Sequence, residues 1–261
     1  MPQLGQTLQR LGLSFTARDI MVPKERLVCA AVETDAPRIS ELYPDYNIIP
    51  IQDNGVLKAF YERDTKASRS ITVQDLVSGE ASVVDLVEIL SGREFCFALV
   101  GNEIGGYVHF SDLNNPLVKL TFYVIFEAFE RHLLTAISPV TEQTIEDTLG
   151  LKRLNRIKER VQNAQADRAN LSLENFLYLP EILRIAVAKG KLSRDEERDK
   201  SIRMFRNRVS HAGWSLVERH GDVKTLIEAK RICMAVLDGA PPDTQEPIGA
   251  SEAQASGTEG F

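Results

Sequence analysis

The chain has 261 residues, of which 43% are hydrophobic, and a formal net charge of −6 at pH 7. That length and apolar content suffice for one or two domains with packed cores. No uninterrupted apolar run approaches the roughly 20 residues that span a bilayer, and the N-terminus shows no basic region followed by a long apolar one. We therefore expect no membrane partner and no signal peptide.

The three cysteines, Cys29, Cys96 and Cys233, are odd in number, widely spaced and set among apolar neighbours. Their spacing matches neither a disulfide framework nor a zinc site, and no His/Cys cluster has the spacing of metal ligands. We expect no bound metal and a reducing, cytoplasmic location.

Charge is distributed unevenly along the chain. When Lys and Arg are counted against Asp and Glu, residues 1–150 carry −9, residues 151–231 carry +8 and residues 232–261 carry −5. A basic segment between acidic ones indicates a polyanion partner for that segment. The alternative is a solvated helical surface that is rich in Lys and Arg.

The first half of the chain predicts short strands and helices in alternation. Residues 1–13 form an expected N-terminal arm, with Leu4, Leu8 and Leu11 at helical spacing. A strand, a helix and two more strands are then predicted in this order: 27–32, 36–42, 47–52 and 56–61. Asp53-Asn54-Gly55, between the last two strands, is a strong hairpin-turn sequence.

A second series of elements in the same order begins near Ile71. Residues 82–90 predict an amphipathic helix, residues 95–100 and 106–110 predict two strands, and Ser111 opens a helical turn. Two successive series of about fifty residues each indicate an internal repeat.

Three stretches of this repeat resemble a known family: "TARDIMVP", "NIIPIQDNGVLKAFYERD" and "FALVGNEIGGYVHFSDLNNP". They are similar to the CBS pair, also called a Bateman module, over about residues 14–116, with repeats at about 14–66 and 71–116. The resemblance implies two α/β repeats that pack pseudo-symmetrically, often with an adenosine-containing ligand in a cleft.

The ribose-binding pattern of that family, Gly-x-x-Thr/Ser-x-x-Asp, spans the end of the third strand and the start of the last helix of a repeat. The resemblance carries this role to Asp64 in the first repeat and to Gly106 and Asp112 in the second. The other pattern positions hold different residues here, namely Lys58, Tyr61 and His109. We expect an AMP- or ATP-like nucleotide as the ligand, and a CBS pair that serves only as a dimerisation scaffold is the alternative.

From Pro116 onward the pattern is helical, which predicts a second domain over residues 117–238. Pro116 suits a first helical position, and the helix 117–137 is apolar around most of its circumference, as in a buried bundle helix. Further helices are predicted at 141–149, at 151–161, at 173–188 with a kink near Pro180, from a Ser193/Glu196 capping box to the motif below, and at 222–237 with Asp222 as the cap. Residues 239–261 predict a disordered tail.

The stretch "RNRVSH" at 206–211 ends one of these helices. Arginine can clamp a phosphate with two hydrogen bonds, and histidine transfers protons near neutral pH. The spacing places Arg206 and His211 roughly 140° apart on a regular helix. They converge only if the helix loosens near its end, if the arginine curls round, or if two chains combine. The alternative is a surface salt bridge for Arg206 and a C-terminal helix cation in His211.

This motif, its basic surroundings and the apolar helix "VKLTFYVIFEAFERHLLTAI" directly after "SDLNNP" resemble HEPN domains fused to CBS pairs. HEPN domains are small helical bundles found in many RNA-cleaving toxins and defence proteins, and the resemblance covers about residues 117–238. The family motif is an arginine, a polar residue, three variable residues and a histidine, and it maps onto Arg206, Asn207 and His211. Members usually place it at a dimer interface, so we expect a homodimer.

The resemblance implies metal-independent RNA cleavage that leaves a 2′,3′-cyclic phosphate. His211 would be the general base or acid, and Arg206 would hold the phosphate and stabilise its developing charge. Asn207 would orient the histidine or hydrogen-bond the phosphate. We add Glu130 of the first bundle helix, because an acidic residue there faces the motif in some members.

The predicted fold is therefore α+β with two domains: an α/β CBS tandem repeat followed by an all-α HEPN-like helical bundle. The first functional hypothesis is an endoribonuclease, a toxin or a defence or stress effector, gated by an adenosine nucleotide at the CBS pair. The second is a non-catalytic nucleotide sensor whose bundle mediates dimerisation or partner binding. Other side chains have structural expectations, His132 and His220 at the surface, Trp214 and Phe205 in the core or an interface.

Overall fold

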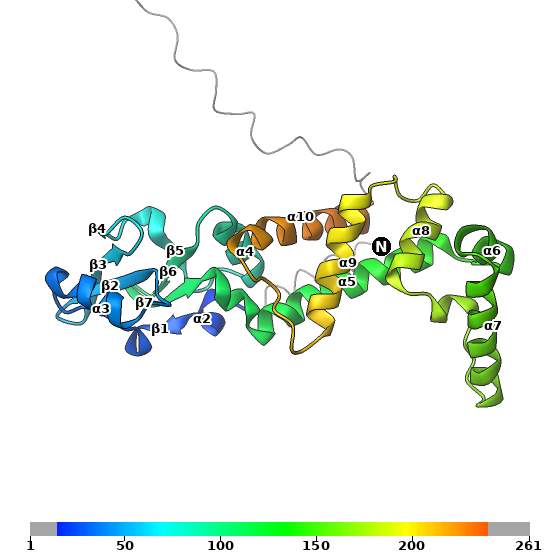
Figure 1. The fold of residues 1–261 in the computed structure, drawn as a ribbon, viewed down its shortest axis with the longest axis horizontal. Helices are drawn as coiled ribbons and strands as arrows, with labels where there is room; N and C mark the ends of the chain where they lie inside the picture. Colours follow the sequence, from blue (N-terminus) through cyan, green and yellow to red (C-terminus); the bar gives the residue numbers. More distant parts are fainter. Residues whose placement is uncertain (1–14, 240–261) are drawn as a thin grey trace, which may run out of the picture.

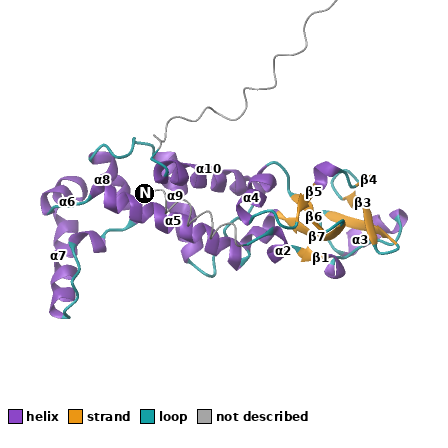
Figure 2. Ribbon diagram, turned by 180° about the vertical axis from the view of Figure 1, so that it is seen from behind, coloured by secondary structure: helices purple, strands orange, loops and turns teal. Residues whose placement is uncertain are grey.

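The computed structural model describes residues 15–239. They form an elongated molecule with its strands gathered at one end and helices along the remainder (Figures 1 and 2). This division agrees with the predicted α+β fold, in which a strand-containing half precedes a helical half. The arm predicted at 1–13 and the tail predicted at 239–261, apart from Gly239, lie outside the described residues.

Three strands of the first repeat form an antiparallel sheet in the order β2-β3-β4. The elements are α3 (Ala36–Leu42), β2 (Ile48–Asp53), β3 (Val56–Glu62) and β4 (Ala67–Ser70). The β2–β3 turn uses Asn54 and Gly55 with φ of 51° and 79°, the left-handed pair that a two-residue hairpin favours. The predicted helix, the two strands and the hairpin turn are thus confirmed.

The strand predicted at 27–32 is wrong, and Pro50 accounts for one side of the missing ladder. That segment contacts β2 through a single parallel bridge at Ala30. The Ala30 N–H donates to the Pro50 carbonyl, and the Gln52 N–H donates to the Ala30 carbonyl. The rung before it, at Val28, would need an N–H from Pro50, which proline lacks, so the ladder cannot extend in that direction.

The second sheet joins the two repeats, with strand order β1-β7-β6-β5. Its strands are β1 (Val22–Pro23), β5 (Leu76–Ser78), β6 (Phe95–Val100) and β7 (Glu103–His109), and its helices are α2 (Ala17–Ile20) and α4 (Val83–Ser91). Short 3-10 helices complete this half at Lys24–Arg26, Glu33–Asp35, Val73–Asp75 and Phe110–Asn114. The elements predicted in the second repeat are confirmed. Since β1 pairs antiparallel with β7, the second repeat completes its sheet with a strand from the first.

The second half is helical, as predicted. Its elements are α5 (Pro116–Ile137), α6 (Glu142–Leu149), α7 (Leu151–Ala166), a 3-10 helix (Leu173–Phe176), α8 (Leu179–Ala188), α9 (Glu196–Ser210) and α10 (His220–Leu237). α7 projects from the end of the molecule that lies farthest from the sheets (Figure 1). The kink predicted near Pro180 is a break just before it, because Pro180 lies in the first turn of α8.

Two predicted helix starts are wrong. α9 is capped by Asp195, whose carboxylate accepts the Arg198 N–H at 3.0 Å. Ser193, the predicted cap, accepts hydrogen bonds from the buried Arg198 guanidinium instead, through its hydroxyl at 3.1 Å and its carbonyl at 2.6 Å. α10 begins at His220, so Asp222 lies inside the first turn and not at the cap.

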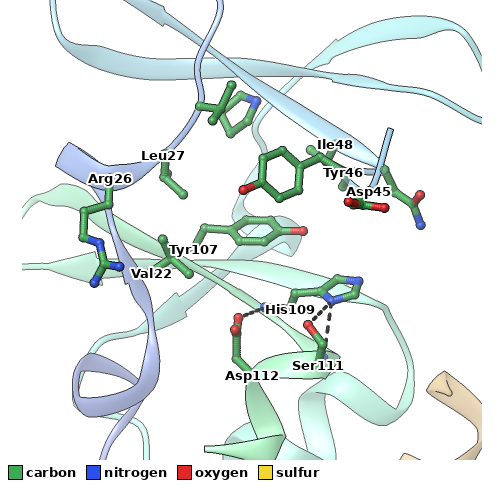
Figure 3. A pocket seen from close by; sticks show the side chains of 13 residues that line it. Val22, Arg26, Leu27, Asp45, Tyr46, Ile48, Tyr107, His109, Ser111 and Asp112 are labelled. Atoms are coloured by element: carbon green, nitrogen blue, oxygen red, sulfur yellow. Dashed lines mark hydrogen bonds between the residues drawn. The ribbon is translucent and has the colours of Figure 1, made fainter. Parts of the chain in front are cut away.

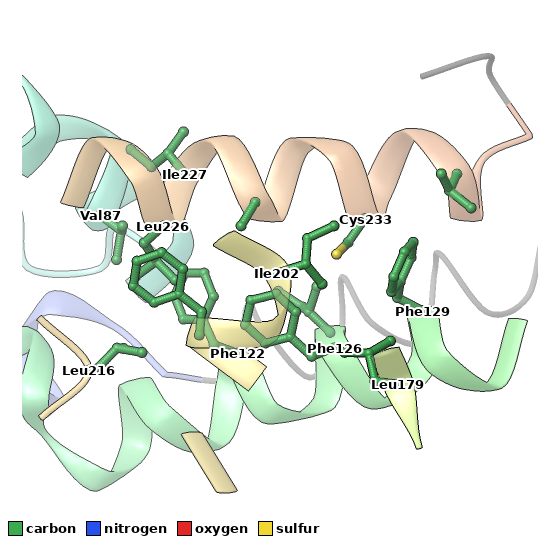
Figure 4. Close-up of a cluster of buried hydrophobic side chains, with 14 of the residues drawn as sticks. Val87, Phe122, Phe126, Phe129, Leu179, Ile202, Leu216, Leu226, Ile227 and Cys233 are labelled. Atoms are coloured by element: carbon green, nitrogen blue, oxygen red, sulfur yellow. The ribbon is translucent and has the colours of Figure 1, made fainter. Parts of the chain in front are cut away.

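One hydrophobic core runs from the second repeat through the helical half. At its centre Phe122, Phe126 and Phe129 of α5 lie beside Leu226 and Cys233 of α10 (Figure 4). α4 of the second repeat also packs against α10. The helical half is therefore joined to the second repeat by shared packing. The first repeat has one small cluster of its own and shares another with the second repeat, in which Phe60 lies with Phe97.

Candidate functional site

A pocket of about 350 Å³ lies between the two repeats (Figure 3). One wall comes from the end of β7 and the 3-10 helix after it, and the other from β1, the segment after it and the start of β2. In the view of Figure 3 the Tyr46 ring lies above the Tyr107 ring. The residues that line the pocket are Val22, Arg26, Leu27, Val28, Asp45, Tyr46, Asn47, Ile48, Pro50, Tyr107, His109, Ser111 and Asp112.

His109 and Asp112 form a polar corner of this pocket. The His109 backbone N–H donates to the Asp112 carboxylate at 2.8 Å, and His109 Nδ1 lies 2.8 Å from the Ser111 hydroxyl. Burial raises the pKa of Asp112 above its ordinary value and lowers the pKa of His109. Asp112 thus lies where β7 meets a helical turn, which is the place that the ribose-binding pattern assigns to its acidic residue.

The other two predicted nucleotide-binding residues do not line this pocket. Asp64 is exposed in the turn between β3 and β4, because the chain continues there as a hairpin and not as the helix that the pattern expects. Gly106 is buried in β7, and an added Cβ would lie 2.6 Å from the Val22 carbonyl oxygen and 2.7 Å from the Met21 sulfur. The missing side chain of Gly106 therefore makes room for β1.

The RNRVSH motif spans the end of α9. The helix ends at Ser210, and His211 has an extended backbone with φ of −109° and ψ of 112°. A helix that ends within the motif is one of the three arrangements that would let Arg206 and His211 converge. The Ser210 hydroxyl donates to the Arg206 carbonyl at 2.8 Å, and the His211 N–H donates to the Asn207 carbonyl at 3.1 Å. Arg206 is half-buried, and Asn207 and His211 are exposed.

Glu130 of α5 contacts the motif directly. Arg206 Nε lies 3.3 Å from Glu130 Oε2, and the two side chains are 35% and 12% exposed. Burial raises the pKa of Glu130, while the charge and the hydrogen bond of Arg206 lower it in part. Glu130 therefore orients the Arg206 guanidinium across 76 residues of sequence.

A second arginine of the motif, Arg208, was not singled out by the sequence. It donates to the Leu216 carbonyl and to Asp222, both at 3.0 Å. Burial alone would raise the pKa of Asp222, but hydrogen bonds from the Glu218 N–H and from Arg208, together with the charge of Arg208, hold it below its ordinary value. This network fixes the loop between α9 and α10.

Trp214 on that loop is 54% exposed, so of the two places expected for it, a core or an interface, it does not occupy the first, whereas Phe205 is fully buried. The Trp214 and His211 ring centroids are 4.7 Å apart. A second pocket of about 600 Å³ lies beside them, lined by Met204, Asn207, Arg208, Gly213, Trp214, Ser215 and Glu218. The small flanking residues of Trp214 were a signal for an exposed loop.

His220 also differs from its expected surface position. It is partly buried, and its Nε2 lies 2.7 Å from the Leu90 carbonyl and 3.1 Å from the Arg93 carbonyl. This side chain links the start of α10 to the end of α4 and the residues before β6. His132 is partly exposed on α5.

Metal-ligand clusters, disulfides and membrane-spanning helices are further features that the described residues allow to be assessed. Nowhere between residues 15 and 239 do three or more His, Cys, Asp or Glu side chains gather so as to hold a metal ion. The three cysteines are free, as their spacing predicted. None of the helices in this range combines the length and apolar character that crossing a bilayer requires.

Comparison with known proteins gives a partial likeness. No family model and no curated protein matches the chain. The CBS domain of the bacterial CNNM/CorC family Mg²⁺ transporter in complex with ATP is 15% identical, with a TM-score of 0.33, over 44% of this chain and 94% of that chain. The same domain in complex with the inhibitor IGN95a is 13% identical, with a TM-score of 0.34, over 44% of this chain and 82% of that chain.

Proposed function

We propose that this chain is a nucleotide-controlled ribonuclease, in which the RNRVSH motif cleaves RNA and the pocket between the repeats binds an adenosine nucleotide. The observation that carries the first part is the Glu130–Arg206 pair beside the helix end at His211. An oriented guanidinium and an accessible imidazole on one short segment suit a phosphodiester substrate. The resemblance of the motif to HEPN ribonucleases agrees with this chemistry.

The reaction is a transesterification that needs no metal ion. A ribose 2′-hydroxyl attacks the adjacent phosphorus, and the bond to the 5′ oxygen breaks, which leaves a 2′,3′-cyclic phosphate and a 5′-hydroxyl. His211 takes the proton from the 2′-hydroxyl or gives one to the leaving oxygen. Arg206 stabilises the charge that develops on the phosphate, and Asn207 hydrogen-bonds the phosphate or the imidazole.

A homodimer completes this proposal, because acid and base are two roles and each chain brings one His211. α5 exposes Leu120 and Tyr123, one turn apart, at 49% and 43%. Their neighbour Lys119 donates to the Ala212 and Trp214 carbonyls, so this face of α5 lies next to the motif loop. An exposed apolar face beside the motif supports a symmetric pair of chains.

Incubation of the purified chain with total RNA and with tRNA in EDTA tests cleavage. Arg206→Ala and His211→Ala are each expected to lower the rate by about 10²- to 10⁴-fold, because each removes a group that acts in the transition state. Arg203→Ala on α9 and His132→Ala on α5 are matched controls, and both should cleave like the wild type. Cleavage that survives both motif substitutions would contradict the assignment.

The pocket between the repeats favours nucleotide sensing as a second function, which stands with or without cleavage. Its lining combines two tyrosine rings with the Asp112 carboxylate, which suits a base and a ribose hydroxyl. Among the described residues that line it, Arg26 is the one Lys or Arg, whereas Asp45 and Asp112 are acidic. These charges favour a nucleoside or monophosphate over a triphosphate.

Thermal unfolding with adenosine, AMP and ATP tests this function. A ligand of the folded state raises Tm by mass action, and we expect AMP to raise it more than ATP. Asp112→Ala should abolish the shift, whereas Asp64→Ala, in an exposed turn away from the pocket, is the matched control and should keep it. No shift with any of the three ligands would leave the pair as a scaffold. A shift without RNA cleavage would leave the sensor as the function.

A further inference from the structure

The loop between α9 and α10 is anchored by hydrogen bonds and exposes the side chain of Trp214. Lys119 donates to the Trp214 carbonyl, and the Trp214 N–H donates to the His211 carbonyl at 3.1 Å. Farther along the loop, Asn114 exchanges hydrogen bonds of 2.9 and 3.0 Å with the backbone of Val217, which is buried. The 54% exposure of the Trp214 side chain is therefore a feature of an anchored loop.

The hollow beside this indole combines apolar and polar walls. Met204 and Trp214 offer apolar surface, and the exposed Asn207 amide offers both a donor and an acceptor. Glu218 borders the hollow with a carboxylate that is 67% exposed and 3.6 Å from the Arg208 guanidinium. An aromatic face with hydrogen-bonding groups at its edge is the usual way in which proteins hold an unstacked base.

We infer that this hollow is a nucleobase subsite, in which a base of single-stranded RNA stacks on Trp214 and presents its edge to Asn207 and Glu218. The inference rests on the proposed function and names its substrate class. A guanine fits best, because its neighbouring N1–H and N2–H donors match the two acceptor oxygens of the Glu218 carboxylate. The ring contact between Trp214 and His211 then brings the nucleotide that carries this base next to the motif.

Trp214 is the sole tryptophan of the chain, so its fluorescence reports on the subsite directly. The full-length wild type is titrated with the 2′-O-methyl oligonucleotides UUGUU and UUUUU, which cannot be cleaved because they lack a free 2′-hydroxyl. We expect UUGUU to quench the fluorescence and to bind more tightly than UUUUU. Glu218→Gln should lose this preference, because an amide offers one acceptor oxygen in place of two.

Variants separate stacking from other roles of the indole. With a labelled UUGUU, Trp214→Leu should weaken the Kd by about 5- to 150-fold, whereas Trp214→Phe should retain most of the affinity. Tyr43→Leu, an exposed aromatic of the first repeat, is the control and should bind like the wild type. Light scattering of Trp214→Leu gives its oligomeric state. Unchanged affinity in Trp214→Leu, unchanged fluorescence at saturation, or loss of the dimer as the sole effect would overturn the subsite.

Cleavage assays distinguish failure of the subsite from failure of the proposed function. Wild-type cleavage with an unchanged KM in Trp214→Leu would overturn the subsite and leave the ribonuclease standing. Binding of labelled UUGUU that weakens in Trp214→Leu and is retained in Trp214→Phe, without cleavage of any RNA, would support the subsite and overturn the ribonuclease.

Discussion

At Glu130, the ionisation state that favours stability differs from the one that suits the proposed chemistry. Burial raises the pKa of this carboxyl group above its ordinary value of 4.5, although Arg206 lowers it in part. A raised pKa means that the folded chain binds this proton more tightly than the unfolded chain does. The contribution to stability is therefore fully present below about pH 4.5 and is lost as the pH rises through the folded-state pKa. A carboxylate kept in such a position is typical of functional sites.

We predict that Glu130→Gln removes this pH dependence and lowers cleavage. At pH 7 the variant should equal or exceed the wild type in its free energy of unfolding, measured by urea denaturation at about pH 4 and pH 7. Its RNA cleavage should fall, because the Arg206 guanidinium loses its orienting carboxylate. Glu127→Gln, on the same helix but paired with Arg131 at the surface, is the matched control. A Glu130→Gln variant whose free energy of unfolding is below that of the wild type at pH 7, but not at about pH 4, would contradict the prediction.

Among the helices and strands, the features that depend on a few neighbouring residues were predicted correctly from the sequence. Pro116 at the first position of α5 and the Asn54-Gly55 turn of β2–β3 act within a few residues, and both predictions are confirmed. The strand at 27–32 failed on one side because the proline that blocks its ladder lies about twenty residues further along the chain. The start of α9 failed because Ser193 and Asp195 are both good caps, and the buried Arg198 uses Ser193 instead.

The packing of α5 on α10 carries much of the stability of the helical half. Phe126 of α5 is 1% exposed within the shared core. We predict that Phe126→Ala lowers the free energy of unfolding by about 3–5 kcal/mol, the usual result of removing a buried phenyl ring. Thr135→Ala on the same helix, where the side chain is exposed, should change it by less than about 0.5 kcal/mol. Urea denaturation of both variants checks this. If both variants lost a similar free energy of unfolding, the assignment of Phe126 to the core face of α5 would be contradicted.

For the molecule as a whole, ring contacts connect the pocket with the helical half. The centroid distances along this path are 6.4 Å for Tyr107–His109, 4.3 Å for His109–Phe110 and 5.6 Å for Phe110–His220. His220 opens α10, directly after the loop that carries His211. A ligand that moves His109 would therefore act on packed groups that continue to the motif loop.

We predict that His220→Ala separates nucleotide binding from its effect on cleavage. The Tm shift caused by AMP should remain, while the change in cleavage rate that AMP causes should disappear. The variant should also lose about 1–3 kcal/mol of stability, because the Leu90 and Arg93 carbonyls lose their donor. Cleavage rates with and without AMP measure the effect, with His132→Ala as the control. A nucleotide effect of wild-type size in His220→Ala would contradict this path.

Some residues of the candidate sites could be predicted from the sequence and others could not. Arg206, Asn207 and His211 form a local motif, so their common position at one helix end follows from the sequence. Glu130 was expected through the family resemblance, because a contact across 76 residues has no local signal. Asp64 failed since a hairpin replaces the expected helix. The hollow beside Trp214 could not be foreseen, because its walls come from a helix and a loop whose packing the sequence does not state.

We propose that His211 and its neighbours cleave RNA through the 2′-hydroxyl. Analysis of the ends that the wild type and His211→Ala leave on RNA in EDTA tests it most directly. We predict 2′,3′-cyclic phosphate and 5′-hydroxyl ends from the wild type and a loss of these products with His211→Ala. Products with 3′-hydroxyl and 5′-phosphate ends, or the same products at the same rate from His211→Ala, would contradict it.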